Sequence, residues 1–130
     1  LNEKIILIEL GINVLGKLTT HVLDVSCGEP ADGVAWTLYR VSDTREKIAS
    51  GKTNSDGRTD SPLLENTMFE LGTYELVFEI GEYFCRKELA DSNSLFLNQV
   101  PIRFSISNNT QNYHVPLLAS PFSYSTYRGS

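Results

Sequence analysis

The sequence predicts an all-β fold, in which two antiparallel sheets form a β-sandwich that carries one short helix. Short segments rich in β-branched and aromatic residues alternate between apolar and polar positions, which is the period of a half-buried strand. Stretches containing Gly, Pro, Asp or Asn separate these segments, as is typical of sandwiches. The chain has 130 residues, of which 41% are hydrophobic and 21% charged, which suits one globular domain with a single core.

The first half of the chain supplies the first predicted strands. Residues 17–25 (KLTTHVLDV) are rich in β-branched side chains and alternate between two faces. The loop at 27–33 separates this segment from a second alternating segment at 34–41 (VAWTLYRV). A weaker strand is predicted at 47–54, and the turn sequence SDG at 55–57 follows it.

The second half contains the helix and the remaining strands. Residues 73–80 (TYELVFEI) predict a strong strand, and residues 81–90 (GEYFCRKELA) predict a short amphipathic helix. Residues 100–107 and 112–120 predict a pair of strands joined by a polar hairpin. The closing residues 122–130 (FSYSTYRGS) are short and polar, and we expect them to be extended.

The N-terminal segment differs in pattern from everything after it. Residues 1–16 place apolar side chains at helical spacing, and Glu3 and Glu9 make the segment unlike a signal peptide. We therefore set the domain boundary after residue 16. Residues 17–130 are expected to form the domain, and residues 1–16 to be an N-terminal extension or the stub of a preceding domain.

Composition and motifs argue against several classes of function. The formal net charge is −5 and the 11 basic residues are scattered, so no nucleic-acid partner is predicted. No apolar run approaches the roughly 18 residues of a spanning helix, so no membrane partner is predicted either. Cys27 and Cys85 lack metal or redox spacing and are expected to be free thiols. Without a phosphate loop or a ligand cluster in the sequence, neither a metal nor a cofactor is expected.

Two histidines and two arginines are the candidates for chemistry. His21 and His114 lie within predicted strands, and a histidine titrates close enough to neutral pH to move a proton. His21 shares its strand face with Thr19, a small polar residue, which argues against a plain core position. Arg58 follows a turn and Arg128 lies in the tail, where each guanidinium is either solvated or available to an anionic substrate. These residues indicate acid–base catalysis with water, in a site that a second copy of the chain could complete.

Five stretches of the chain resemble a known family. They are LTTHVLD (18–24), TNSDGRTD (53–60), GTYELVFEIGEYF (72–84), YHVPLL (113–118) and YSTYRGS (124–130). In this order they resemble the 5-hydroxyisourate hydrolases, the enzyme branch of the transthyretin-like proteins, and they spread over the whole predicted domain. The closing YRGS is a specific marker of that branch.

The resemblance implies a fold, an assembly and a set of site residues. It implies the transthyretin-like two-sheet antiparallel β-sandwich and a homotetramer, a dimer of dimers, with active sites in the channel where the dimers meet. The family's motifs fall on the catalytic residues His21, Arg58, His114 and Ser130 and on the substrate-binding residues Tyr127, Arg128 and Gly129.

The reaction implied by the resemblance is the hydrolytic ring opening of 5-hydroxyisourate to 2-oxo-4-hydroxy-4-carboxy-5-ureidoimidazoline, a step of urate degradation in purine metabolism. His21 or His114 would deprotonate the attacking water, and the residues alone do not say which. Arg58 would stabilise the negative charge that develops on the attacked oxygen. Ser130 and the terminal carboxylate would orient a histidine or shuttle protons.

Alternatives stay open at this point. The chain could be a transthyretin-like small-molecule binding protein without catalytic activity, although that branch lacks the YRGS ending and the paired histidines. It could also be a structural sandwich in which the histidines are ordinary strand residues. Residues 1–16 could be the end of a fused decarboxylase that acts on the ring-opened product. A cytoplasmic location is the default expectation, with the periplasm and the peroxisome left open.

Overall fold

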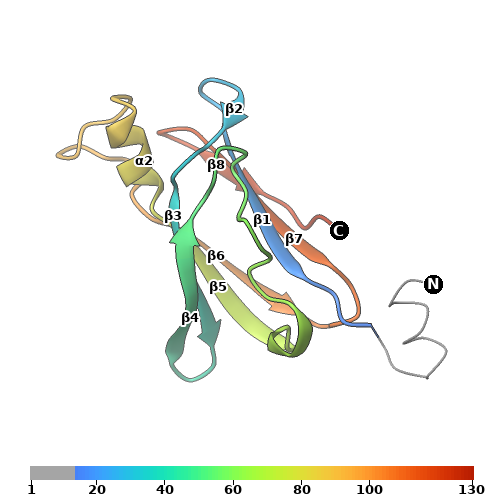
Figure 1. Cartoon of the computed structure of the whole chain (residues 1–130). Coiled ribbons are helices and arrows are strands. Elements are labelled where there is room, and N and C mark those ends of the chain that lie inside the picture. The colour runs from blue at the N-terminus through green and yellow to red at the C-terminus, as the bar shows by residue number, and fades with distance from the viewer. Residues whose placement is uncertain (1–13) are drawn as a thin grey trace.

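The computed structural model describes residues 14–130, which form a two-sheet β-sandwich (Figure 1). The predicted fold class is therefore confirmed. The helical pattern and the extension predicted for residues 1–16 fall mostly on residues 1–13, which lie outside the described part of the chain. The domain boundary after residue 16 thus stays a prediction.

The first sheet places the two histidine-bearing strands side by side. Its strands lie in the order β2-β1-β7-β8. Their bounds are Leu18–Asp24 for β1, Glu29–Pro30 for β2, Tyr113–Ala119 for β7 and Tyr124–Thr126 for β8. β1 and β7 pair in parallel, whereas the β1–β2 and β7–β8 pairs are antiparallel. The parallel pair is an exception to the antiparallel arrangement expected from the sequence, because its strands come from opposite ends of the domain and no local turn signals their direction.

The second sheet is antiparallel throughout and has the order β4-β3-β5-β6. Its strands are Ala35–Val41 for β3, Arg45–Lys52 for β4, Gly72–Phe78 for β5 and Val100–Ile106 for β6. The sequence predicted each of these strands close to its observed bounds. The hairpin predicted between residues 100–107 and 112–120 is wrong, because β6 pairs with β5 whereas β7 crosses to the other sheet and pairs with β1 and β8. The alternation of side chains is therefore a sufficient signal for the strands of this sheet, although not for their order.

The helix forms where it was predicted but ends earlier. α2 comprises Ile80–Arg86, whereas the amphipathic pattern covers residues 81–90. Glu88 has a φ of 61°, in the left-handed region, and its backbone N–H donates to the Cys85 carbonyl at 2.9 Å. A residue in this conformation ends a helix, so the amphipathic side-chain pattern continues to residue 90 although the helical backbone ends at Arg86. A short 3-10 helix, η1 at Asn66–Met68, precedes β5 and was not predicted.

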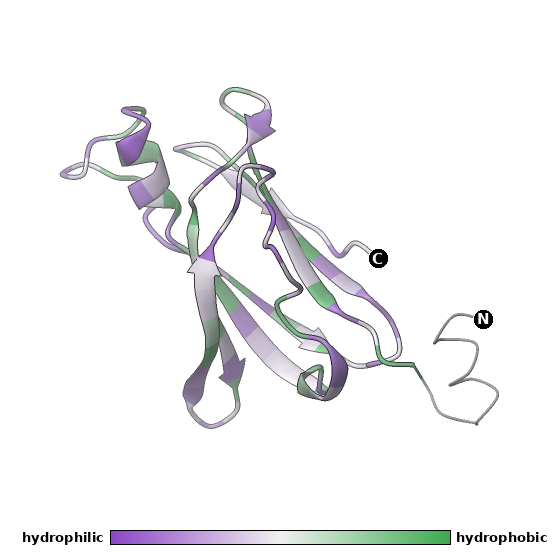
Figure 2. Ribbon diagram, in the orientation of Figure 1, coloured by the Kyte–Doolittle hydropathy of each residue, from purple (hydrophilic) through white to green (hydrophobic). Residues whose placement is uncertain are grey.

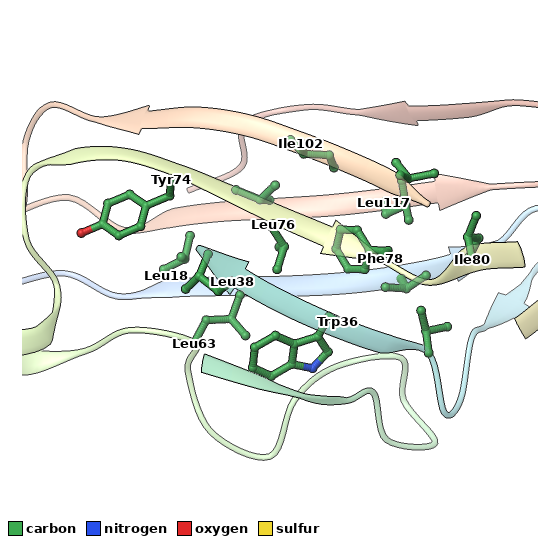
Figure 3. Packing of buried hydrophobic residues seen from close by; sticks show 14 of the residues in the cluster. Leu18, Trp36, Leu38, Leu63, Tyr74, Leu76, Phe78, Ile80, Ile102 and Leu117 are labelled. Carbon is green, nitrogen blue, oxygen red and sulfur yellow. The ribbon is translucent and has the colours of Figure 1, made fainter. Parts of the chain in front are cut away.

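The hydrophobic core fills the space between the two sheets. Alternation along β1 turns Leu18 and Val22 inward and leaves Thr19 and His21 partly exposed on the outer face. Figure 2 shows the same alternation as bands of hydrophobic and hydrophilic colour along the strands. Figure 3 shows the inward side chains meeting between the sheets; it labels Leu18, Trp36, Leu38, Leu63, Tyr74, Leu76, Phe78, Ile80, Ile102 and Leu117.

A buried carboxylate ties α2 to β1. Asp24 is 1% exposed, and it accepts hydrogen bonds from the Tyr83 hydroxyl at 2.8 Å and the Ser26 backbone N–H at 2.9 Å. The Ser26 hydroxyl makes a further short hydrogen bond to the same carboxylate. Burial acts to raise the pKa of Asp24, but the hydrogen bonds from Ser26 and Tyr83 outweigh it, so the pKa is lowered. Asp24 is therefore charged at neutral pH, and both of its carboxylate oxygens accept hydrogen bonds.

The described residues also bear on membranes, metals and thiols. Between residues 14 and 130, no helix is long and apolar enough to cross a membrane. Within the same stretch, no three His, Cys, Asp or Glu side chains gather as metal ligands would. Cys27 is exposed, Cys85 is half-buried, and both are free thiols.

Candidate active site

The two histidines project from neighbouring strands on the outer face of the first sheet. His21 lies on β1 and His114 on β7, and in each strand the histidine alternates with buried residues. In the parallel register, Thr19 stands opposite His114 and His21 stands opposite Pro116. His21 and His114 are therefore diagonal neighbours on one face, although they come from opposite ends of the domain. The structure brings together the two histidines that the sequence singled out.

The C-terminal tail lies along the other side of His114. The Gly129 backbone N–H donates to the His114 carbonyl at 2.7 Å, and the His114 N–H donates to the Gly129 carbonyl at 3.2 Å. A Cβ added to Gly129 would lie 3.0 Å from both Cβ and Cδ2 of His114, so glycine is the residue that lets the tail approach this closely. Gly129 thus lies directly beside His114, and the exposed Ser130 follows it.

The loop that carries Arg58 is anchored on β1. Gly57 has a φ of 72°, and its carbonyl accepts a hydrogen bond from the Val22 N–H at 2.8 Å. A Cβ added to Gly57 would clash with the Val22 carbonyl oxygen, so a larger residue would push the loop off the strand. The Asn54 side chain closes the turn, because its Oδ1 accepts from the backbone N–H groups of Asp56 at 2.9 Å and Arg58 at 3.2 Å.

Burial and the charge of Arg58 act on both histidines. Burial lowers the pKa of His21 and of His114, and the positive charge of Arg58 lowers both further. His21 adds to the lowering at His114, whereas a hydrogen bond with the Asp56 backbone and the charge of Asp56 act in the opposite direction on His21. Both imidazoles are therefore neutral at pH 7, the form that can accept a proton or donate a hydrogen bond.

A hydroxyl that the sequence did not assign to the site contacts His114. The Oγ1 atom of Thr19 lies 2.8 Å from Nδ1 of His114. The sequence placed Thr19 on the same strand face as His21, which was the available signal, but it gave no indication of the neighbouring strand. The contact depends on the β1–β7 register, and that pairing is not encoded locally.

Arg128 makes its contacts away from the histidines. Its guanidinium donates to Oε1 of Gln111 at 3.1 Å and to the Asn112 carbonyl at 3.2 Å. It also lies over the Tyr113 ring, 4.3 Å from the ring centroid. Within this chain, Arg128 therefore fastens the tail to the start of β7, and the substrate-binding role expected for it stays a prediction.

Tyr127 lies at a groove between the free edges of the two sheets. A cavity of about 350 Å³ is lined by Tyr127 and Thr126 on one side and by β6 residues such as Phe104 on the other. β8 and β6 are the terminal strands of their sheets, so their outer edges carry no strand of this chain among the described residues. Neither histidine contributes to the lining of this cavity.

The histidine face is open rather than enclosed. A cavity of about 490 Å³ lies beside α2, where Glu29 and Arg86 contribute to its lining, and it contains neither histidine. Farther along the first sheet, a hollow of about 410 Å³ is lined by Val25, Leu118 and Tyr124 among others. Both histidines are partly exposed, and a smaller hollow of about 140 Å³ is lined by Thr19 and Arg58 among others.

This sandwich and this site define a class of protein. The chain belongs to the HIUase/Transthyretin family, whose model matches residues 18–129. The matched range includes both histidines, Arg58 and Gly129.

Proteins similar to this chain include several named hydrolases. The chain is 53% identical over 116 residues to 5-hydroxyisourate hydrolase 2 of Rhizobium meliloti, and the match covers 88% of this chain and 97% of that protein. It is 47% identical over 117 residues to the 5-hydroxyisourate hydrolase of Halalkalibacterium halodurans, with 88% and 98% covered.

Similar solved structures include two named enzymes and a transthyretin in complex with thyroxine. A crystal structure of (S)-allantoin synthase has a TM-score of 0.85 at 43% identity; the match covers 91% of this chain but 45% of that one, so this chain spans less than half of it. The 5-hydroxyisourate hydrolase of Klebsiella pneumoniae has a TM-score of 0.73 at 34% identity, with 88% and 94% covered. Sea bream transthyretin in complex with thyroxine has a TM-score of 0.78 at 27% identity, with 87% and 94% covered.

Proposed function

We propose that this protein is a 5-hydroxyisourate hydrolase, which adds water to open the ring of 5-hydroxyisourate and yields 2-oxo-4-hydroxy-4-carboxy-5-ureidoimidazoline. The observation that carries the proposal is that His21 and His114 project from one sheet face with the tail paired to His114, while Arg58 lies near enough for its charge to lower the pKa of both rings. The relatives at 47% and 53% identity, which carry this name, support the choice of substrate.

The chemistry follows from neutral imidazoles beside a fixed positive charge. One histidine takes a proton from water as the water oxygen bonds to a ring carbonyl carbon of the substrate. The Arg58 guanidinium stabilises the negative charge that forms on the carbonyl oxygen. When the adjacent carbon–nitrogen bond breaks, the same histidine returns its proton to the departing nitrogen. Atoms and charge balance without a metal or a redox cofactor.

The tail supplies the remaining groups of the proposed site. Gly129 pairs antiparallel with His114, so Ser130 follows next along β7. Its proposed role is to orient a histidine or relay its proton. Tyr127 and Arg128 keep their predicted part in shaping the substrate pocket, and the contacts of Arg128 with Gln111 and Tyr113 suggest that it acts by holding the tail.

An assembly is part of the proposal. The histidine face is open, and exposed aromatic side chains such as Phe122 and Tyr124 lie at the same sheet. Both features support a homotetramer, a dimer of dimers, in which another copy covers this face and completes the substrate pocket. A domain of residues 17–130 and a cytoplasmic location stay predictions from the sequence.

The direct test is the decay of 5-hydroxyisourate, generated in situ from urate and followed by its ultraviolet absorbance. The intact protein is expected to accelerate the decay well beyond the spontaneous rate. Arg58→Gln is expected to lower kcat/KM by about 100-fold, because it removes the charge that stabilises the oxyanion.

Arg103→Gln is the matched control, since Arg103 is an exposed arginine on the second sheet that pairs with Glu75. It is expected to retain the activity of the unmodified protein. A folded, intact protein that does not accelerate the decay would exclude the hydrolase. Binding of a small apolar ligand would then indicate the carrier branch of the fold.

A further inference from the structure

Thr19 is held beside His114 by the central strand pair of the first sheet. In the parallel β1–β7 register, Thr19 stands directly opposite His114, and both side chains project from the outer face. The hydroxyl Oγ1 lies 2.8 Å from Nδ1 of the imidazole. Because both backbones belong to regular strands, the contact is fixed by the sheet rather than by a loop.

The neighbouring threonine shows what such a hydroxyl does elsewhere on the strand. Thr20 points into the core and donates its hydroxyl proton to the Val115 carbonyl at 2.7 Å. Thr19 differs in its partner: among residues 14–130, its hydroxyl has Nδ1 of His114 as its hydrogen-bond partner and no carbonyl or carboxylate. A hydroxyl carries one proton, and the acceptor available to it here is the ring nitrogen.

We propose that Thr19 is a positioning residue that donates its hydroxyl proton to Nδ1 of His114, keeps the ring proton on Nε2, and thereby makes His114 a neutral hydrogen-bond donor to the substrate. This inference rests on the proposed hydrolase function. It also assigns the proton-transfer step, because an imidazole held in this tautomer has no free lone pair with which to deprotonate water. The general base is then His21.

The surroundings of the two rings agree with this division. Asp56 raises the pKa of His21 and partly offsets burial and Arg58, whereas every contribution at His114 lowers its pKa. On the far side of His114 the tail packs closely, since a Cβ on Gly129 would lie 3.0 Å from Cδ2 of the ring. The imidazole is thus confined between Thr19 and Gly129.

In the reaction, His21 takes the proton of the attacking water, whose oxygen bonds to the ring carbonyl carbon. The Nε2–H of His114 and the Arg58 guanidinium donate hydrogen bonds to the oxyanion and keep their protons. The ring carbon–nitrogen bond then breaks, and His21 returns its proton to the nitrogen. A neutral imidazole is suited to this task because it donates without first having to be protonated.

Thr19→Val tests the proposal, because valine keeps the branched shape and lacks the hydroxyl. The expected result is a kcat lower by about tenfold with KM nearly unchanged, the size of one lost hydrogen bond. Thr19→Ser is expected to restore most of the rate. Nitrogen-15 NMR of the His114 ring is expected to show the proton on Nε2 in the unmodified protein and a mixture of tautomers in Thr19→Val.

Thr20→Val is the matched control, since it makes the same change one residue along the strand. It leaves the buried Val115 carbonyl without its donor, so it is expected to lower the melting temperature while kcat and the His114 tautomer stay unchanged. The opposite pattern is expected for Thr19→Val, which changes a partly exposed face.

The two readouts separate the inference from the function on which it rests. Equal kcat in Thr19→Val and the unmodified protein overturns the proposal, and so does an unmodified protein with the ring proton on Nδ1. If the protein has no hydrolase activity but Thr19→Val alters the tautomer as expected, the hydrolase fails while the control of His114 by Thr19 holds.

Discussion

The two faces of β1 carry polar residues with opposite uses. On the core face, Thr20 and Asp24 are buried, and every strong hydrogen-bonding group they present has a partner. On the outer face, Thr19 and His21 are partly exposed to solvent. Polarity alone therefore does not mark a site on this strand. The candidate site differs in that its polar side chains are held in place by the sheet but keep hydrogen-bonding capacity that is not used within the chain.

The outer face of the second sheet also carries a charged group, but there the charge is paired. There Glu75 is 7% exposed, and Arg45 and Arg103 bind its two carboxylate oxygens at 2.8 and 3.0 Å. Burial acts to raise the pKa of Glu75, but the two arginines outweigh it and lower it. Its charge is thus neutralised from both sides. The first sheet instead leaves Arg58 exposed beside two neutral histidines.

The largest expected effect comes from the outer face. His21→Asn removes the proposed base and is expected to lower kcat by at least about 100-fold, the usual contribution of a general base. The sandwich should stay folded, because the side chain is not part of the core. The measurement is 5-hydroxyisourate decay together with the circular dichroism spectrum and the melting temperature. Loss of folding would place His21 among the structural residues.

Asp24→Asn, three positions along the same strand, is expected to show the reverse. It weakens the hydrogen bonds from Ser26 and Tyr83 and is expected to cost about 2 kcal/mol of unfolding free energy. The activity of the folded protein should be retained. Urea unfolding measures the cost, and Tyr83→Phe, which removes the partner hydroxyl alone, is expected to cost about 1 kcal/mol. A stable but inactive Asp24→Asn would contradict the contrast between the faces.

The pH dependence of stability tests Asp24 as well. Its pKa is lowered in the folded protein, so its contribution is complete above the ordinary carboxyl pKa and is lost as the pH falls through the folded value. Acid unfolding curves of the unmodified protein and Asp24→Asn are therefore expected to converge at low pH. Curves that stay parallel throughout would mean that the carboxylate charge contributes nothing.

The pH dependence of activity reports on the outer face instead. Burial and Arg58 lower the pKa of His21, so kcat/KM is expected to stay level at neutral pH and to fall only below the ordinary histidine pKa of about 6.5. In Arg58→Gln the residual activity is expected to fall at a higher pH, because the charge that lowers the pKa is gone. If kcat/KM falls at the same pH in Arg58→Gln and in the unmodified protein, Arg58 does not control the pKa of the base.

A smaller effect is expected at the tail. Arg128→Gln loses the stacking on Tyr113 and part of the hydrogen bonding to Gln111 and Asn112. If Arg128 acts by holding the tail, kcat is expected to fall by about fivefold, corresponding to about 1 kcal/mol, with KM nearly constant. Tyr113→Leu, which removes the ring beneath the guanidinium, should give a similar change. A large rise in KM in Arg128→Gln alone would instead show direct contact with substrate.

Most of the fold could be predicted from local sequence, because alternation marks a strand wherever one face is buried. The positions of β1, β3 and β5 follow from that pattern. The parallel β1–β7 pairing could not be predicted, since the two strands are far apart in the chain and share no turn. The helix end was missed for a similar reason: it depends on the left-handed backbone of Glu88, an unusual conformation for that residue type.

The residues of the candidate site also differ in whether local sequence or the pairing of distant strands identifies them. Motif resemblance singled out His21, Arg58, His114 and Gly129; strand pairing places His21, His114 and Gly129 together, and the charge of Arg58 lowers the pKa of both histidines. The sequence did not assign Thr19 to the site, because its contact with His114 depends on the register between β1 and β7. The other tail residues are hardest to assign from the sequence, since neighbours in the chain point in different directions when a segment is extended.

In the proposed function, the histidine face and the C-terminal tail together hydrolyse 5-hydroxyisourate. The most direct measurement is the decay of 5-hydroxyisourate with the intact protein and with a variant lacking residues 127–130, followed by absorbance and by circular dichroism of the product. We expect fast, stereoselective decay with the intact protein and the spontaneous rate with a truncated variant that still folds. Equal rates for the two folded proteins would contradict the account.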